Sequence, residues 1–270
     1  MSAERGRNGA DADPGAGSAP AGWLRHAWEQ THTLLIAVLI ALAIRAFVVE
    51  PFRIPSGSML PNLLIGDHLF VSKFVYGVKL PFVDMRLPGL REPRRGDVVV
   101  FTVARQGPEI HPADRRPELR REEFVKRIVG VPGDVIEVRD GTFLLNGEHV
   151  EHAPLGRRFE DEAGRPLTVL EERIDGSAHL VLDDPRLPGL SRARFTVEPG
   201  RYFFMGDNRD HSNDSRRWGT VSAEQLKGPA FVLYWSWNYN GGWLELLSPL
   251  TWWRLLTEET RWGRIGDAVE

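Results

Sequence analysis

The feature that most limits what this chain can fold into is an apolar run near its N-terminus. Every residue of 34–44 is apolar, and beyond Arg45 the run continues to Val49. Residues 33–49 number 17, which is the lower limit for crossing about 30 Å of hydrocarbon as a helix. Arg45 stands near one end, where its guanidinium can reach the lipid interface. We therefore predict an uncleaved transmembrane anchor over residues 31–50.

Two other interpretations of the run stay open. It could be a removable signal peptide, because Ala41-Leu42-Ala43 is a small-x-small cleavage pattern, but the stretch before it is unusually long and contains acids as well as arginines. It could also be a buried core helix, although no amphipathic face marks it. Charge does not decide the orientation of an anchor, since arginines stand on both sides of the run: Arg5, Arg7 and Arg25 before it, Arg45 and Arg53 close to its end.

Composition limits the remaining classes. Residues 1–22 are rich in Gly, Ala, Asp and Pro, which bury little surface, so we expect a disordered tail over residues 1–30. The chain has no cysteine, which excludes disulfides and thiolate chemistry. A formal net charge of −3 gives no reason to expect a nucleic-acid partner.

From residue 51 onward the pattern is that of β-structure. Gly-Asp precedes apolar runs at Gly66-Asp67, Gly96-Asp97 and Gly133-Asp134, where Gly supplies the turn and Asp bonds nearby amides. Asn146-Gly147 between two short runs is a strong hairpin signal, and residues 231–238 read as a further strand. The predicted class is all-β, with antiparallel sheets over residues 51–270 and one N-terminal transmembrane helix; within these residues, about 151–199 is interpreted as an inserted region.

The first chemical motif is the loop that carries Ser56 and Ser58. The string RIPSGSMLP sets these hydroxyls around a glycine and between prolines, which suits a loop that holds a hydroxyl in one place. Ser-Gly-Ser is also common in inert turns. A serine nucleophile moreover needs a base, because its hydroxyl hardly ionises alone.

Histidine, the usual base, is not supported. None of the eight histidines stands in a known serine-hydrolase motif, and there is no G-x-S-x-G. His149 and His152 could bind a metal, but no further ligands accompany them. We expect them on a solvated strand, and we expect no metal site and no cofactor.

Lysine is the better candidate for the base. In the string FVKRIVGVPGD the strand period of two places Lys126 on the face of Phe124 and Ile128. An ammonium among apolar neighbours loses hydration, which lowers its pKa and leaves a neutral amine that can accept a proton. A lysine on a strand more often points to water, so this pattern alone leaves both possibilities open.

A third motif lies in residues 205–219, where MGDNRDHSNDSRRWG is dense in hydrogen-bonding side chains. It could be a solvated, charged loop. Trp218 and the preceding Phe203-Phe204-Met205 give it apolar borders, which favours polar groups that support a partly buried site.

In this order, the blocks PFRIPSGSMLPNLLIGDHLFVSKFVYG, RRGDVVVF, FVKRIVGVPGD and GDNRDHSNDSRRWG resemble the bacterial type I signal peptidases, a family of serine–lysine peptidases. The resemblance covers most of residues 50–77, 94–150 and 200–238. It departs at His211, where Asn is usual, and at Arg217, where an aromatic residue is common.

The resemblance implies a role for each matching residue. Ser58 would attack the scissile carbonyl and Lys126 would accept its proton. Ser212 would hydrogen-bond the Lys126 amine. The Ser56 hydroxyl and the Ser58 N–H would form the oxyanion hole. An ion pair of Asp214 with Arg216 would support the site. Shallow apolar pockets for an Ala-x-Ala sequence would be lined by Phe52, Ile54, Leu63, Val100, Phe124 and Val125.

The resemblance also implies partners and a location. The substrates would be exported preproteins with signal peptides, and the protein translocation machinery would lie close by. The chain would cross the bacterial inner membrane once, with its catalytic domain on the periplasmic side. The Trp-rich residues 235–253 would contact the lipid interface or serve as core aromatics. Two alternatives remain: a specialised relative that matures pilus or conjugation proteins, and an inactive membrane-tethered scaffold.

Overall fold

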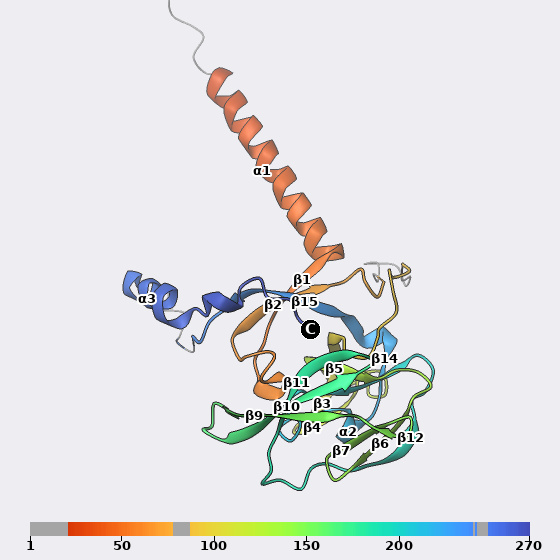
Figure 1. The fold of residues 1–270 in the computed structure, drawn as a ribbon. Coiled ribbons are helices and arrows are strands. Elements are labelled where there is room, and N and C mark those ends of the chain that lie inside the picture. Colours follow the sequence, from red (N-terminus) through yellow and green to blue (C-terminus); the bar gives the residue numbers. More distant parts are fainter. Residues whose placement is uncertain (1–20, 78–86, 240, 242–247) are drawn as a thin grey trace, which may run out of the picture. The chain divides into compact units, whose positions relative to one another are not determined.

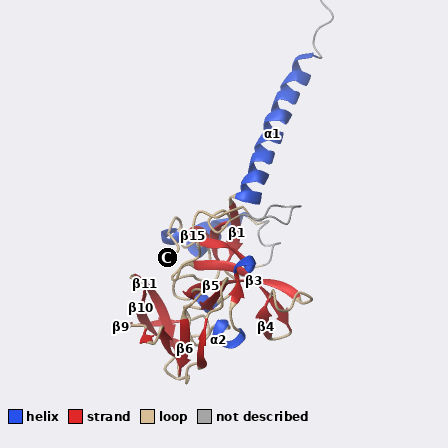
Figure 2. Cartoon of the chain, turned by 90° about the vertical axis from the view of Figure 1, so that its right-hand side faces the viewer, coloured by secondary structure: helices blue, strands red, loops and turns tan. Residues whose placement is uncertain are grey.

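The computed structural model describes residues 21–77, 87–239, 241 and 248–270. The chain divides into two compact units, of which the second runs from Arg45 to Glu270. The first described element is the helix α1, Ala21–Phe47, drawn as a single helix in Figures 1 and 2. Its residues Gln30–Phe47 are long and apolar enough to cross a membrane.

The helix corrects two boundaries. Residues 21–30, predicted as part of a disordered tail, are helical, because the apolar run propagates a helix into good helix formers such as Leu24 and Ala27. The helix ends at Phe47, three residues before the predicted end of the anchor. Glu50 precedes Pro51, and a residue before proline disfavours the helical conformation, so the chain becomes extended here.

The second unit consists mainly of strands, as Figure 2 shows in red, and its sheet pairings are antiparallel as predicted. The largest sheet has the order β1-β2-β15-β3-β5-β13-β14, with β4 paired to β3. Its strands are β1 Val49–Arg53, β2 Asp67–Ser72, β3 Val98–Gln106, β4 Glu109–Pro112, β5 Arg120–Gly130, β13 Arg201–Met205, β14 Val221–Ser222 and β15 Leu226–Ser236. The last long strand of the chain, β15, therefore lies between two early ones.

Two smaller sheets complete the domain (Figure 1). One has the order β12-β6-β7-β8 and the other the order β11-β10-β9. Most of residues 151–199, the predicted inserted region, belong to these sheets. Their strands are β6 Val135–Arg139, β7 Thr142–Leu145, β8 Glu148–His149, β9 His152–Glu160, β10 Pro166–Ile174, β11 Ser177–Asp183 and β12 Arg192–Thr196.

Several local predictions are confirmed. Strands β2, β3 and β6 each follow a Gly-Asp pair, or begin at its Asp. Leu145 pairs with Glu148 across Asn146 and Gly147, and both turn residues have positive φ, as the mirror-image hairpin turn requires. The predicted strand 231–238 begins earlier, at Leu226, because β15 accommodates Gly228 next to a register shift and continues through Pro229, which lies opposite Val99.

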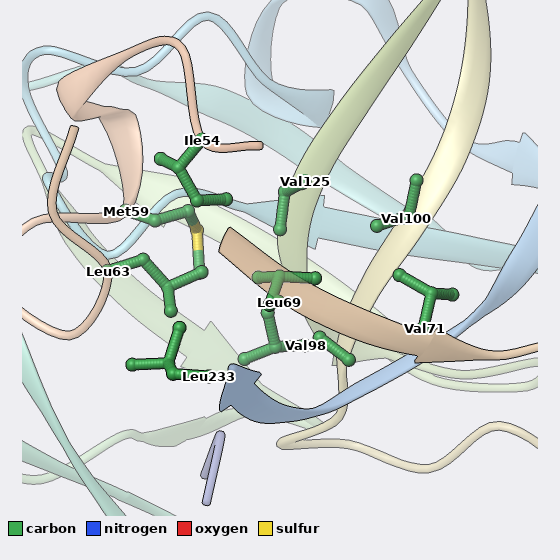
Figure 3. Close-up of a cluster of buried hydrophobic side chains, with 10 residues drawn as sticks. Ile54, Met59, Leu63, Leu69, Val71, Val98, Val100, Val125 and Leu233 are labelled. Atoms are coloured by element: carbon green, nitrogen blue, oxygen red, sulfur yellow. The ribbon is translucent and has the colours of Figure 1, made fainter. Parts of the chain in front are cut away.

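The apolar core nearest the site packs between β1, β2, β3, β5 and β15. Figure 3 shows its side chains, among which Met59 and Leu63 come from the loop after β1. Because Ile54 and Met59 flank the Ser56–Ser58 segment and are only 2% and 1% exposed, the core fixes both ends of the short turn that carries the serines.

The Trp-rich C-terminal region contains α3, Pro249–Arg254. Trp252 and Trp253 are 49% and 67% exposed, so the interpretation of residues 235–253 as core aromatics is wrong for these two rings. Trp235 is half-buried and contacts Trp237 and Trp262 edge-on. Trp243 lies outside the described residues. Contact with lipid stays a prediction.

Candidate active site

Ser58 lies in a short 3₁₀ turn, Gly57–Met59, between β1 and β2. The turn is held by the third motif, residues 205–219, which we call the third block from here on. Asn208 N donates to Ser58 O at 3.1 Å, and Asn208 Nδ2 donates to Gly57 O at 3.0 Å. The carbonyl oxygens of Gly57 and Ser58 both accept hydrogen bonds. These bonds hold the backbone at Ser58, whose side chain is half-buried.

Lys126 reaches Ser58 from β5. Its side chain is only 4% exposed, and Nζ forms a short hydrogen bond with Ser58 Oγ. The ring of Phe124 lies on the same side, with its centroid 5.3 Å from Nζ, as the alternation along β5 predicted. When the amine is neutral, the Ser58 hydroxyl is the donor in this bond.

Burial lowers the pKa of Lys126 to about 8, because the ammonium loses its hydration. The negative charges of Asp214 and Asp207 act in the opposite direction, and Arg216 assists the lowering. The carboxylates of Asp214 and Asp207 are instead paired with Arg216 and Arg127, so desolvation dominates. At neutral pH a usable fraction of Lys126 is therefore the free base.

Ser56 is exposed, and its Oγ lies 3.5 Å from Ser58 Oγ. A hydroxyl at this distance is within reach of an oxygen that develops charge on a carbonyl attacked by Ser58.

Ser212 is buried behind the nucleophile, but its expected hydrogen bond to Lys126 is not present. Its hydroxyl has no partner in good hydrogen-bond geometry within the described residues. The space around it is close: a Cβ on Gly206 would overlap Ser212 Oγ and lie 2.5 Å from Ser58 O. Glycine at position 206 thus allows the third block to pack directly against the serine turn.

Asp214 and Arg216 form the expected ion pair, fully buried. Arg216 Nε donates to Asp214 Oδ1 at 2.9 Å and Nη2 donates to Oδ2 at 2.8 Å. Burial alone would raise the pKa of Asp214, but the Arg216 charge, its hydrogen bonds and the Gly206 N–H hold it below the ordinary value. Asp214 also caps the short helix α2, Ser215–Trp218, by accepting from Arg216 N.

A second buried ion pair was not predicted. Arg127 donates from Nε and Nη2 to the two oxygens of Asp207, each at 2.8 Å, and both side chains are 1% exposed. Asn62 Nδ2 also donates to Asp207, at 2.7 Å. The sequence does contain a signal for this pair. The strand period that places Lys126 on one face of β5 places Arg127 on the other, and a guanidinium buried there requires an acidic partner.

A cavity of about 630 Å³ opens beside Ser58 and Lys126. Four of the six predicted pocket residues line it, namely Phe52, Ile54, Phe124 and Val125. Leu63 and Val100 do not. They are 1% and 0% exposed and belong to the apolar core shown in Figure 3, because the strands around them cover them from the cavity.

The β9–β10 turn supplies another part of the cavity lining, through Asp161, Glu162, Ala163 and Arg165. No role was predicted for this region, since no recognised motif falls in it.

His149 is exposed on β8, and His152 begins β9. His152 Nε2 lies 2.6 Å from Glu172 Oε2. Within the described ranges, no group of three or more His, Asp or Glu side chains could hold a metal ion.

Comparisons with known proteins agree with the motifs. The family model described as "Signal peptidase, peptidase S26" matches residues 27–235. A signal peptidase I of Pseudomonas fluorescens is 37% identical over 212 residues, which cover 74% of this chain and 69% of the relative. One of Pseudomonas aeruginosa is 36% identical over 214 residues, with the same coverage. A crystal structure of a signal peptidase I from Enterococcus faecalis V583 is 24% identical, covers 52% of this chain and 97% of that one, and has a TM-score of 0.29.

Proposed function

Because the chain belongs to the signal peptidase family, peptidase S26, we propose that it is a membrane-bound serine endopeptidase that removes signal peptides from exported preproteins through a Ser58–Lys126 dyad. The observation that carries the dyad is the hydrogen bond between Ser58 Oγ and the buried amine of Lys126. The same bond argues against an inactive scaffold.

The reaction would begin with the neutral Lys126 amine. It accepts the hydroxyl proton of Ser58 as Oγ attacks the scissile carbonyl carbon. The resulting oxyanion would be stabilised by the Ser56 hydroxyl and the Ser58 N–H, where one such donor is worth roughly 100- to 1000-fold in rate. The Lys126 ammonium then gives its proton to the leaving amine, and the C–N bond breaks. Water, deprotonated by the regenerated amine, releases the acyl group from Ser58.

Ser212, Asp214 and Arg216 would support this chemistry without contacting the substrate. Ser212 is assigned the orientation of the Lys126 amine, and its buried hydroxyl forms no hydrogen bond of good geometry within the described residues. The Asp214–Arg216 pair would keep the third block folded against the serine turn. It also offsets the Asp214 charge, which would otherwise raise the pKa of Lys126.

The cavity supports a preference for small residues before the cut. Phe52, Ile54, Phe124 and Val125 give it an apolar portion next to the dyad, which suits the alanines of an Ala-x-Ala sequence. The helix Gln30–Phe47 supports anchoring in the bacterial inner membrane. The proposal places the domain on the periplasmic side, close to the translocation machinery that delivers preproteins.

The test is cleavage of an Ala-x-Ala preprotein by the full-length protein in detergent. We expect Ser58→Ala and Lys126→Met each to lose at least about 1000-fold in kcat/KM, and the double variant to be no worse, because the two residues act as a unit. Ser177→Ala, which changes an exposed serine on β11, is the matched control. Substantial activity in Lys126→Met would contradict its role as base. A panel of unrelated preproteins separates a general enzyme from a specialised relative for pilus or conjugation substrates.

A further inference from the structure

The turn between β9 and β10, residues 161–165, forms one wall of the cavity that contains Ser58 and Lys126. We call it the hairpin tip. It is separated by more than 30 residues from each catalytic side chain along the chain, so the fold alone brings it there. A polypeptide bound in the cavity would therefore lie against the hairpin tip.

The hairpin tip has a fixed conformation. The carboxylate of Asp161 accepts the N–H groups of Ala163 and Arg165 at 3.0 and 2.9 Å, and Arg165 Nε donates to it at 2.7 Å. Gly164 has a φ of 70°, which a residue with a side chain rarely adopts. A turn braced in this way presents its remaining side chains, Glu162 and Ala163, in a defined direction.

The hairpin tip is also tied to the loop that supports the dyad. Arg165 Nη1 lies 3.1 Å from His211 Nδ1, and His211 Nε2 lies 3.0 Å from Asp184 Oδ2. His211 directly precedes Ser212. These contacts hold the hairpin tip against the third block, so its distance from the reacting atoms is set by the structure.

Most of the carboxylates that line the cavity form an ion pair with a neighbouring cation. Glu122 pairs with Arg105, Glu123 with Lys227, and Asp161 with Arg165. Glu162 is exposed and forms no ion pair within the described part of the chain. It is therefore the carboxylate of the lining that is left to meet a charge on a bound substrate.

From this arrangement we propose that Glu162 selects the charge of the substrate just after the scissile bond, favouring a basic residue over an acidic one. The inference rests on the proposed function, in which the apolar portion of the cavity takes the residues before the cut. The charged portion is then left for the first residues after it. Water and salt partly screen the charge of an exposed carboxylate. We therefore expect a threefold to tenfold effect on kcat/KM, which weakens as salt increases.

The test uses the full-length protein in detergent and a preprotein in which each of the first three residues after the cut is, in turn, Lys, Gln or Glu. The wild type should cleave the Lys substrate three to ten times faster in kcat/KM than the Glu substrate at one or more of these positions. Glu162→Gln should remove the difference and Glu162→Lys should reverse it, while the Gln substrate changes little. Glu148→Lys, which reverses an exposed charge on β8 away from the cavity, should keep the wild-type order.

Two results overturn the inference and can be told apart. If the wild type and Glu162→Lys cleave all substrates in the same order, the hairpin tip does not select charge, and the peptidase assignment stands. If no preprotein is cleaved faster by the wild type than by Ser58→Ala, the proposed function fails, and the inference falls with it. The thermal unfolding midpoint of each variant shows whether it is folded, and at an exposed position we expect no change.

Discussion

The buried amine of Lys126 should destabilise the folded protein, although the proposed activity requires it. This cost in folding free energy can be measured. Its pKa falls from 10.5 to about 8 through burial, and each tenfold change in proton affinity corresponds to about 1.4 kcal/mol. Keeping a charged amine in this site therefore costs about 3 kcal/mol of folding free energy. Lys126→Met replaces the amine with a flexible apolar chain of similar length, which fills the same space without the charge.

The sign of the pH dependence follows from the lowered pKa. Below pH 8 the amine is charged in both the folded and unfolded states, and the full cost applies. Between pH 8 and 10.5 the folded protein holds a neutral amine while the unfolded chain still binds the proton, so wild-type stability rises with pH relative to the variant. Lys126→Met should be about 3 kcal/mol more stable than wild type at pH 7, with the advantage mostly gone above pH 10.5.

The assay is chemical unfolding of both full-length proteins in the same detergent at a series of pH values, followed by the difference in unfolding free energy. All other titrating groups are shared, so they cancel in the difference to a first approximation. A difference that stays flat from pH 7 to 10.5 would refute the desolvation argument, whatever its size. A wild type more stable than the variant at pH 7 would show that the Ser58 bond outweighs burial.

Three further predictions test the site and the anchor. The kcat/KM of the wild type should rise with pH along a limb centred near pH 8, the lowered pKa of Lys126; a limb near pH 6.5 that disappears with one histidine substitution would instead indicate a Ser–His enzyme. Gly206→Ala should lower the unfolding free energy by roughly the 1–3 kcal/mol that overpacking costs, and it should lower kcat/KM because its Cβ would displace Ser212 and the Ser58 carbonyl; Gly263→Ala, where a Cβ meets nothing within 4 Å, should be near neutral. The full-length chain should stay with membranes during alkaline extraction because of Gln30–Phe47, and recovery in the soluble fraction would contradict an uncleaved anchor.

Local patterns predicted the parts of the site that depend on local rules. The strand period placed Lys126 on an apolar face, and the Gly-Asp and Asn-Gly pairs located strands and a hairpin, because turn chemistry is decided within a few residues. The region of residues 205–219 was expected to be a partly buried polar support, and there Asp214 and Arg216 are fully buried.

What the sequence could not predict depends on contacts between distant segments. Asp207 shares its carboxylate between Arg127 and Asn62, 80 and 145 positions away. No pattern in the sequence around Asp207 predicts either partner. Leu63 and Val100 are apolar residues near the motifs, but their depth below the cavity is decided by neighbouring strands. The hairpin tip has no motif, since its place beside Ser58 comes from how β9 and β10 pack on the third block.

Because β15 lies between β2 and β3, the large sheet can be completed only late in synthesis of the chain. The serine turn follows β1 and is attached to β2, whereas Lys126 is on β5, and in the large sheet only β15 joins β2 to β3 and β5. A chain still being made contains both dyad residues long before Leu226–Ser236 has emerged, and until then the strand pairing that joins β2 to β3 is missing, although Asn208 already follows β13 and can bond the serine turn. We therefore expect a chain that ends before β15 to contain both dyad residues without holding them in the geometry of the complete sheet.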